Sequence, residues 1–159
     1  MPRFFVFLGA ALLLGVMPAQ AHDGEHAAAP ATAQASAESE IRALIHRQAA
    51  AIASMSIEGI AALVAAPERF SIVEGAHANW TWQDYRDKHL VPEFTSPNFK
   101  ITAYEIGEIK VTVGHDLAFA VYDYVIKAEV KGKELAKKNY TTVVLTRTPK
   151  GWRILHEHS

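Results

Sequence analysis

The chain has 159 residues, the length of one domain, and it contains no cysteine, so no disulfide can stabilise its fold. Its 16 Lys and Arg against 17 Asp and Glu give a formal net charge of −1, and no basic arm stands out. These features count against a disulfide-rich scaffold and against a nucleic-acid-binding protein. The lysines between positions 127 and 138 flank a predicted hairpin turn, where a solvated tip explains them better than an anionic partner.

The first 21 residues have the form of a secretory signal peptide. Arg3 supplies a positive charge, residues 4–17 form an apolar run, and Ala19-Gln20-Ala21 matches the small-x-small pattern that precedes a cleavage site. The run is only 14 residues long, too short to span a hydrocarbon core of about 30 Å. We therefore expect cleavage after Ala21, a periplasmic or secreted protein, and no membrane association once the peptide is removed.

Residues 22–37 are rich in alanine and show no apolar period, so we expect a flexible linker before a domain at residues 38–159. The linker begins with two histidines close together, His22 and His26. An N-terminal amine with the imidazole of His22, and His26 nearby, could bind copper. A tail that binds no metal is the simpler interpretation, and no motif in the chain points to a metal site or to a cofactor.

Two helices are predicted at the start of the domain. Apolar residues recur at i, i+3, i+4 and i+7 between Ile41 and Met55, with Gln48 among them, which indicates an amphipathic helix. A short second helix covers residues 57–64, with Ser56 as its N-cap.

A short β-prone segment at residues 69–74 separates these helices from a third. Thr81 followed by Asp84 fits a helix cap, and the third helix is predicted over residues 81–91. Pro92 is expected to close it, because proline disrupts a helix interior.

The rest of the chain is predicted as strands joined by turns. The strands cover residues 99–113 (with a bulge at Gly107), 117–130, 135–148 and 152–158. A run of antiparallel strands needs a cover on one face, and the amphipathic helices supply it. The expected fold is α+β, with a curved antiparallel sheet wrapped around the N-terminal helices and a tapering cavity inside.

Two stretches of this pattern, HANWTWQDYRDKHLVPEF and the closing TPKGWRILHEHS, resemble the nuclear-transport-factor-2-like superfamily and, within it, the SnoaL-like group. The resemblance covers about residues 38–159. It implies a cone-shaped barrel with an internal pocket, usually homodimeric through the outer face of the sheet. It implies no single activity, because relatives include isomerases, dehydratases, cyclases and domains without catalysis.

The ketosteroid-isomerase branch of the superfamily uses an aspartate base with a tyrosine and a second acid as oxyanion donors. That set cannot be placed in this sequence. Tyr122 and Asp123 are adjacent on a predicted strand, so they point to opposite faces.

The third helix carries the most polar group of residues expected to face inward. Tyr85, His89 and Glu93 are spaced four apart, so one helix face can hold all three, unless Pro92 bends Glu93 away. A histidine beside a carboxylate can act as an acid or a base near neutral pH. The alternative is structural, with His89 or Glu93 capping the helix end.

Aromatic residues and histidines before this helix and on the last two strands are further candidates for the pocket lining. His77 and Trp80 precede the helix, and Trp80 could form an aromatic wall or plug the cone. On the last strand, a strict period of two puts Trp152, His156 and His158 on one face. The other face then takes Arg153, Leu155 and Glu157. Tyr140 on the preceding strand completes the ligand-binding candidates.

The leading hypothesis is an exported, homodimeric domain that binds a small, mostly apolar ligand in its cone. The alternative is an acid/base enzyme of the isomerase, dehydratase or cyclase type, in which His89 and His156 converge with Glu93 or Tyr85 as orienting groups. A third hypothesis is metal handling through the His22 tail. We expect no nucleic-acid partner.

Overall fold

A computed structural model describes residues 31–159. The expected signal peptide and the candidate metal ligands His22 and His26 lie outside these residues. The helices are α1 (Ala31–Ala53), α2 (Ile57–Ala61), α3 (Trp82–Tyr85), the π-helical turn η1 (Arg86–Leu90) and α4 (Val91–Phe94). The strands are β1 (Ser71–Glu74), β2 (His77–Asn79), β3 (Phe99–Val113), β4 (Leu117–Val130), β5 (Lys133–Thr148) and β6 (Gly151–His158).

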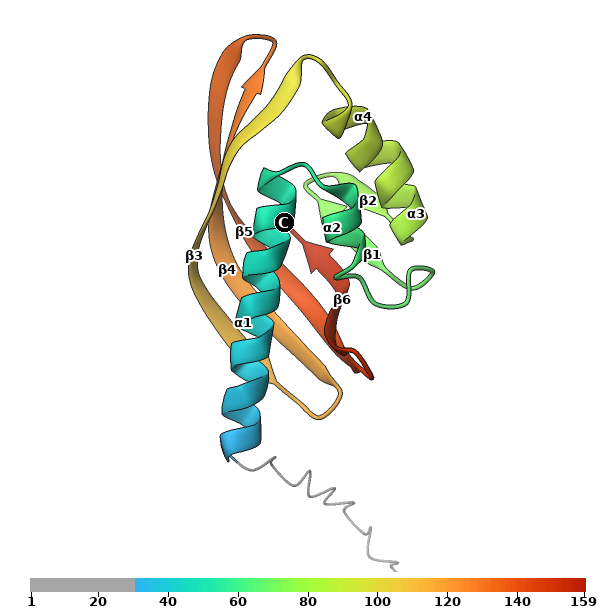
Figure 1. Cartoon of the computed structure of the whole chain (residues 1–159), viewed down its shortest axis with the longest axis vertical. Coiled ribbons are helices and arrows are strands. Elements are labelled where there is room, and N and C mark those ends of the chain that lie inside the picture. Colours follow the sequence, from blue (N-terminus) through green and yellow to red (C-terminus); the bar gives the residue numbers. More distant parts are fainter. Residues whose placement is uncertain (1–30) are drawn as a thin grey trace, which may run out of the picture.

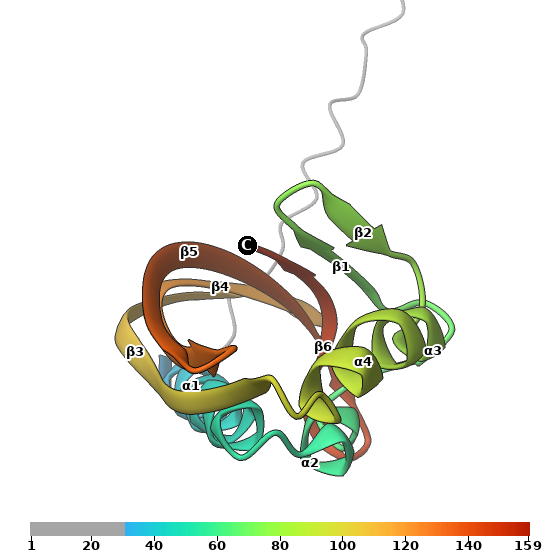
Figure 2. The same ribbon diagram turned by 90° about the horizontal axis from the view of Figure 1, so that it is seen from above.

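The strands form one six-stranded sheet in the order β2-β1-β6-β5-β4-β3. The sheet curls around α1, and α2, α3 and α4 lie on the open side of the curl (Figures 1 and 2). The fold is therefore α+β and cone-shaped, as predicted. One pairing departs from the expected antiparallel sheet, because β1 pairs parallel to β6. The short β2 strand, which pairs with β1, is missing from the prediction.

Helix α1 packs its apolar stripe onto the concave face of the sheet. Ile41, Leu44 and Ile45 on this stripe are each at most 1% exposed, and α1 contacts both β3 and β6. The helix begins at Ala31, so residues 31–37, expected to be linker, are helical, and Ala37 is buried. Gln48, one turn beyond Leu44, is a polar residue in this apolar stripe, and it is only 4% exposed.

The third predicted helix does not stop at Pro92. Thr81 caps it as expected, by accepting a hydrogen bond from the Asp84 backbone N–H, but the helical segment continues through α4 to Phe94. The π-helical turn η1 precedes Pro92, and the Val91 N–H donates to the Arg86 carbonyl, five residues back. A π turn widens the helix, so the proline ring avoids the clash that an α-helical turn would cause.

The last strand breaks the period of two that the sequence predicts. On β6, Ile154 pairs with Leu145 and His156 pairs with Val144, so Leu155 has no partner on β5. Such a β-bulge reverses the side-chain parity beyond it. Trp152 and Ile154 are buried, and so is Glu157, whereas His156 is half-buried and His158 is exposed. The expectation that His156 and His158 share the inner face with Trp152 is therefore wrong.

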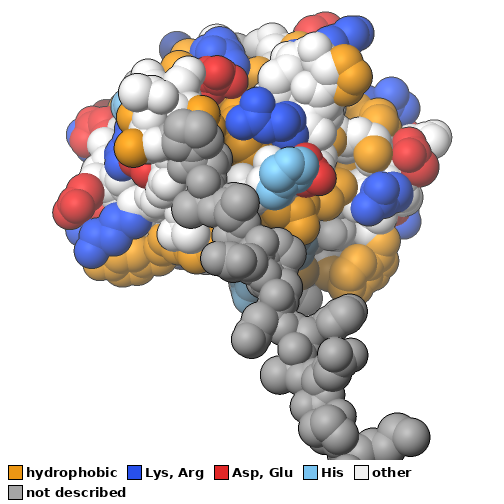
Figure 3. Space-filling view, turned by 90° about the horizontal axis from the view of Figure 1, so that it is seen from below, with side chains coloured by type: hydrophobic (Ala, Val, Ile, Leu, Met, Phe, Trp, Pro, Cys, Tyr) orange, Lys and Arg blue, Asp and Glu red, His pale blue; other side chains and the backbone are white. Residues whose placement is uncertain are grey.

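Within residues 31–159, no helix is both long enough and apolar enough to cross a membrane. The end of the molecule seen in Figure 3 carries Lys and Arg, Asp and Glu, and apolar side chains interspersed with one another. This mixture agrees with the small net charge of the chain.

Candidate functional site

A pocket lies inside the cone, between the sheet and the helices. It encloses about 690 Å³ of space not filled by atoms, including the part open to solvent at its mouth. Every helix contributes to its wall, together with β1, β3, β4 and β6. Most of the wall is apolar or aromatic. The polar lining residues other than tyrosine are Gln48, Glu74, His89, Glu93 and Glu157.

Glu157 is the most deeply placed acid of the pocket. Its side chain is 6% exposed, and its Oε2 accepts a hydrogen bond of 2.7 Å from Gln48 Nε2. Thr141 Oγ1 donates a longer bond of 3.4 Å to Oε1. Burial raises the pKa of Glu157 to about 7, and the Glu74 carboxylate adds to the rise, while the Gln48 and Thr141 bonds partly offset it. The carboxyl group is therefore poised to exchange a proton near neutral pH.

A second polar cluster lies where α4 meets β1. His89 Nε2 is 3.4 Å from a carboxylate oxygen of Glu93 and also 3.4 Å from one of Glu74. The hydrogen bond to Glu93 raises the pKa of His89, and Glu74 contributes in the same direction against desolvation. Burial raises the pKa of Glu74, although the neighbouring His89 opposes this. One imidazole thus bridges two carboxylates.

Tyrosines form much of the remaining wall. The rings of Tyr104 and Tyr124 stack with centroids 4.8 Å apart, and Asn139 Nδ2 donates to Tyr124 Oη at 3.1 Å. The Tyr85 ring lies 5.1 Å from the His89 ring, centroid to centroid. Burial raises the pKa of Tyr85 well above its ordinary value, so its hydroxyl stays protonated and can donate.

This pocket in an α+β cone can be compared with known proteins. Residues 41–159 match the family model of the SnoaL-like domain. The chain belongs to the SnoaL-like family. No curated protein is similar enough in sequence to count as a match.

Solved structures similar to this SnoaL-like domain share its fold at low sequence identity. A nuclear-transport-factor-2-like superfamily protein from Salmonella enterica has a TM-score of 0.73 and 18% identity, over 79% of this chain and 90% of its own. A protein from Shewanella frigidimarina, provisionally named a ketosteroid isomerase, has a TM-score of 0.60 and 20% identity, over 72% and 90%. A provisionally named dehydratase of the same superfamily from Streptomyces avermitilis has a TM-score of 0.66 and 15% identity, over 78% and 95%.

The structure of the SnoaL-like domain brings together three of the sequence candidates. Tyr85, His89 and Glu93 all line the pocket from one face of the helical segment, and Pro92 does not turn Glu93 away. Ligand binding by these three stays a prediction.

Three further candidates lie outside the pocket lining. His77 is exposed on β2, and Trp80 is 68% exposed after that strand, so it neither plugs the cone nor walls the pocket. Tyr140 is also 68% exposed and lies on β5, a strand that contributes nothing to the lining.

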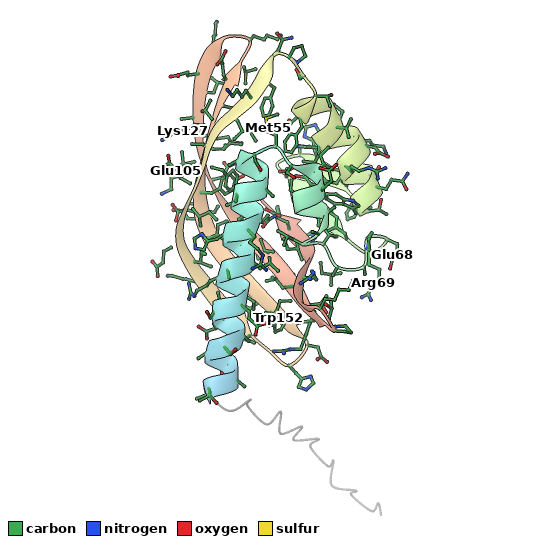
Figure 4. The ribbon with its side chains drawn as sticks, viewed as in Figure 1. Met55, Glu68, Arg69, Glu105, Lys127 and Trp152 are labelled. Carbon is green, nitrogen blue, oxygen red and sulfur yellow. The ribbon has the colours of Figure 1, made fainter. Side chains whose placement is uncertain are left out.

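The candidates on β6 are also absent from the lining. Trp152 is buried in the core near the start of β6, toward the opposite end of the sheet from α4 (Figure 4). His156 Nδ1 pairs with Ser71 Oγ at 2.8 Å, and His158 is exposed. Because His156 and Glu157 are adjacent on a strand, His156 points away from the pocket that Glu157 lines. The expected convergence of His89 with His156 is therefore wrong.

The sequence reasoning missed Gln48, Glu74 and Glu157 as site residues. Gln48 offered a signal, since a polar side chain in an apolar helix stripe needs a polar partner in the core. No sequence signal marks the bulge at Leu155 that turns Glu157 inward. Among residues 31–159, no group of three His, Cys, Asp or Glu side chains is arranged to hold a metal ion.

The raised pKa of Glu157 makes stability depend on pH. The native state holds a proton on Glu157 up to about pH 7, whereas the unfolded chain releases it near the ordinary glutamate pKa of 4.5. The protonated Glu157 therefore makes its full contribution to the free energy of unfolding below pH 4.5. This contribution, roughly 3 kcal/mol, is lost as the pH rises to about 7.

We expect Glu157→Gln, which mimics the neutral acid, to gain stability relative to the unmodified protein when pH rises from about 5 to about 8. Urea unfolding at both pH values measures this gain. Glu105→Gln, on a side chain 57% exposed on β3, is the matched control and should show no gain. Parallel pH profiles for Glu157→Gln and the unmodified protein would contradict the assignment.

Proposed function

We propose that the protein is an exported domain that binds a small, mostly apolar ligand in the pocket of its cone. The observation that carries this proposal is the composition of the pocket wall. Apolar and aromatic side chains from every helix and from β3, β4 and β6 surround a few convergent polar groups, which is the usual make-up of a small-molecule site.

Export is proposed from the sequence alone, on the signal-peptide pattern of residues 1–21.

A second candidate function is proton transfer on the bound ligand. It is favoured by one observation, the carboxyl group of Glu157 with a pKa of about 7 at the inner wall of the pocket. His89, Tyr85 and Glu74 line the same pocket and could hold or relay a proton. Two proteins of similar fold are provisionally named an isomerase and a dehydratase. In this candidate function Glu157 takes the acid/base role that the sequence analysis gave to His156.

Filling the pocket tests the first proposal. Ile126 lines the pocket from β4, and its neighbour Val125 points to the opposite face of the sheet. We expect 2-tetralone, a neutral apolar ketone, to show saturation transfer in NMR with the unmodified protein and with Val125→Trp. Ile126→Trp should abolish the transfer, because the indole occupies the ligand's space. Circular dichroism melting checks that both variants fold.

Equal saturation transfer for the two tryptophan variants would contradict a ligand site in the cone.

The same sample in D₂O separates binding from catalysis. Exchange of the acidic C–H protons of 2-tetralone faster than in buffer alone, and slowed by Glu157→Gln, favours the enzyme. Binding without accelerated exchange favours the ligand-binding domain.

We also propose that two copies of the chain pair through the outer face of the sheet. Leu117 and Phe119 on β4 are 54% and 45% exposed, and Tyr140 on β5 is 68% exposed. Phe119 lies directly opposite Val144, which continues the apolar surface onto β5. Exposed large apolar side chains gathered on one face of a sheet mark a protein contact, and the occupant we propose is a second copy of this chain.

Sedimentation tests the pairing. We expect the unmodified protein to sediment with the mass of a dimer, and Phe119→Lys with that of a monomer, since a lysine pair would be desolvated at the centre of the contact. Trp80→Lys is the control, because Trp80 is an exposed aromatic residue that lies on neither β4 nor β5. A monomeric unmodified protein would refute the proposal.

A further inference from the structure

The charges that line the pocket do not balance. Three carboxylates, Glu74, Glu93 and Glu157, face one imidazole, and no Lys or Arg lines the pocket. His89 Nε2 lies 3.4 Å from both Glu74 and Glu93, so this imidazole is already partnered by those two groups. Glu157 has no cationic partner, because its hydrogen-bond donors, Gln48 and Thr141, are neutral.

An unpaired acceptor lies beside Glu157. Gln48 gives its Nε2–H to Glu157, while its Oε1 has no hydrogen-bond partner among the described residues. Gln48 is 4% exposed and lines the pocket. A buried acceptor without a donor costs about 1–3 kcal/mol, so a donor brought by a ligand would be favoured here. Glu157 and Gln48 together therefore present acceptors that the protein leaves without a charged donor.

The neighbouring wall suits a cation with an apolar body. Tyr85, Tyr104 and Tyr124 line the pocket, and the last two are stacked. Tyrosine rings attract cations through their negative faces. Aliphatic and phenyl side chains cover the rest of the wall. An anionic ligand would meet the surplus of carboxylates, and an alcohol would bring a single neutral donor.

We propose that the pocket selects small amphipathic amines, with the protonated nitrogen donating to the Glu157 carboxylate and Gln48 Oε1 and the apolar body against the tyrosine wall. The inference rests on the proposed ligand-binding function and names its ligand class. The charge surplus, the missing cationic partner of Glu157 and the unpaired amide oxygen all point to a donor-rich cation.

Binding of an ammonium ion should also release a proton. The free protein holds a proton on Glu157 up to about pH 7, and a bound cation stabilises the ionised form. The amine affinity should then rise between about pH 6 and about pH 8, because the ligand stays protonated while Glu157 ionises. His77 and Lys137 act on Glu74 electrostatically, not on Glu157. The polar and titratable groups around Glu157 are Gln48 from α1, Glu74 from β1, Tyr85 from α3, His89 from η1, Glu93 from α4, Tyr104 from β3, Tyr122 and Tyr124 from β4, and Thr141 from β5.

Three probes of one shape test the inference: cyclohexylmethylamine, cyclohexylmethanol and cyclohexanecarboxylate. Isothermal titration calorimetry on the purified protein at about pH 8 should give an amine affinity at least roughly ten-fold higher than that of the alcohol, and the weakest binding for the carboxylate. In Glu157→Gln the amine should fall to the level of the alcohol, while the alcohol changes little. Glu105→Gln, on the exposed part of β3, should keep the preference.

The outcomes separate this inference from the proposed function. Alcohol binding without amine preference overturns the amine inference and leaves a ligand-binding pocket. No binding of any probe counts against both. An amine preference that survives Glu157→Gln overturns the assignment to Glu157. Should Glu157→Gln fail to fold, the pH series on the unmodified protein decides, since an amine affinity that is flat from about pH 6 to about pH 8 contradicts the inference.

Discussion

A carboxylic acid inside an apolar fold persists only where the fold supplies hydrogen-bond donors, and Glu157 obtains its shortest bond from Gln48 on α1. This contact joins the first helix of the domain to its last strand, 109 residues apart in sequence. It exists because the bulge at Leu155 reverses the parity of β6 after Ile154. Without the bulge, Glu157 would face outward and Gln48 would be buried without a partner.

Much of the pocket depends on the same change of parity. Ile72 on β1 pairs with Glu157 on β6 in parallel, and both side chains are buried. The register of this pairing therefore determines which side chains of β1 point into the cone. Glu74, two residues further along β1, then points to the same side and reaches His89. The inner wall thus combines residues distant in sequence, and the pairing of β1 with β6 places two of its three carboxylates, Glu74 and Glu157.

The fold could be predicted closely from the sequence because its signals are local. The strand limits of β4 match the prediction, the register of β3 against β4 shifts between Ile106 and Ile109 around the expected bulge at Gly107, and Thr81 caps α3. Lys131 and Gly132 take positive φ in the expected hairpin turn. The four-residue spacing of Tyr85, His89 and Glu93 also placed them correctly on one helix face, because that geometry needs no tertiary information.

The rest of the site could not be predicted, because it depends on register between distant strands. A bulge without glycine leaves no mark in the sequence, so a period of two assigned every residue beyond Leu155 to the wrong face. The parallel pairing of β1 with β6 is equally non-local. Gln48 was the one residue whose type conflicted with its position, and that conflict pointed to a buried polar partner.

Glu157 lies inside the cone, with its carboxyl group held against Gln48. A ¹³C NMR titration of the Glu157 carboxyl carbon, assigned by its loss in Glu157→Gln, tests this placement most directly. We expect a titration midpoint near 7. A midpoint at the ordinary glutamate pKa of 4.5 would place the side chain in solvent and contradict its burial against Gln48.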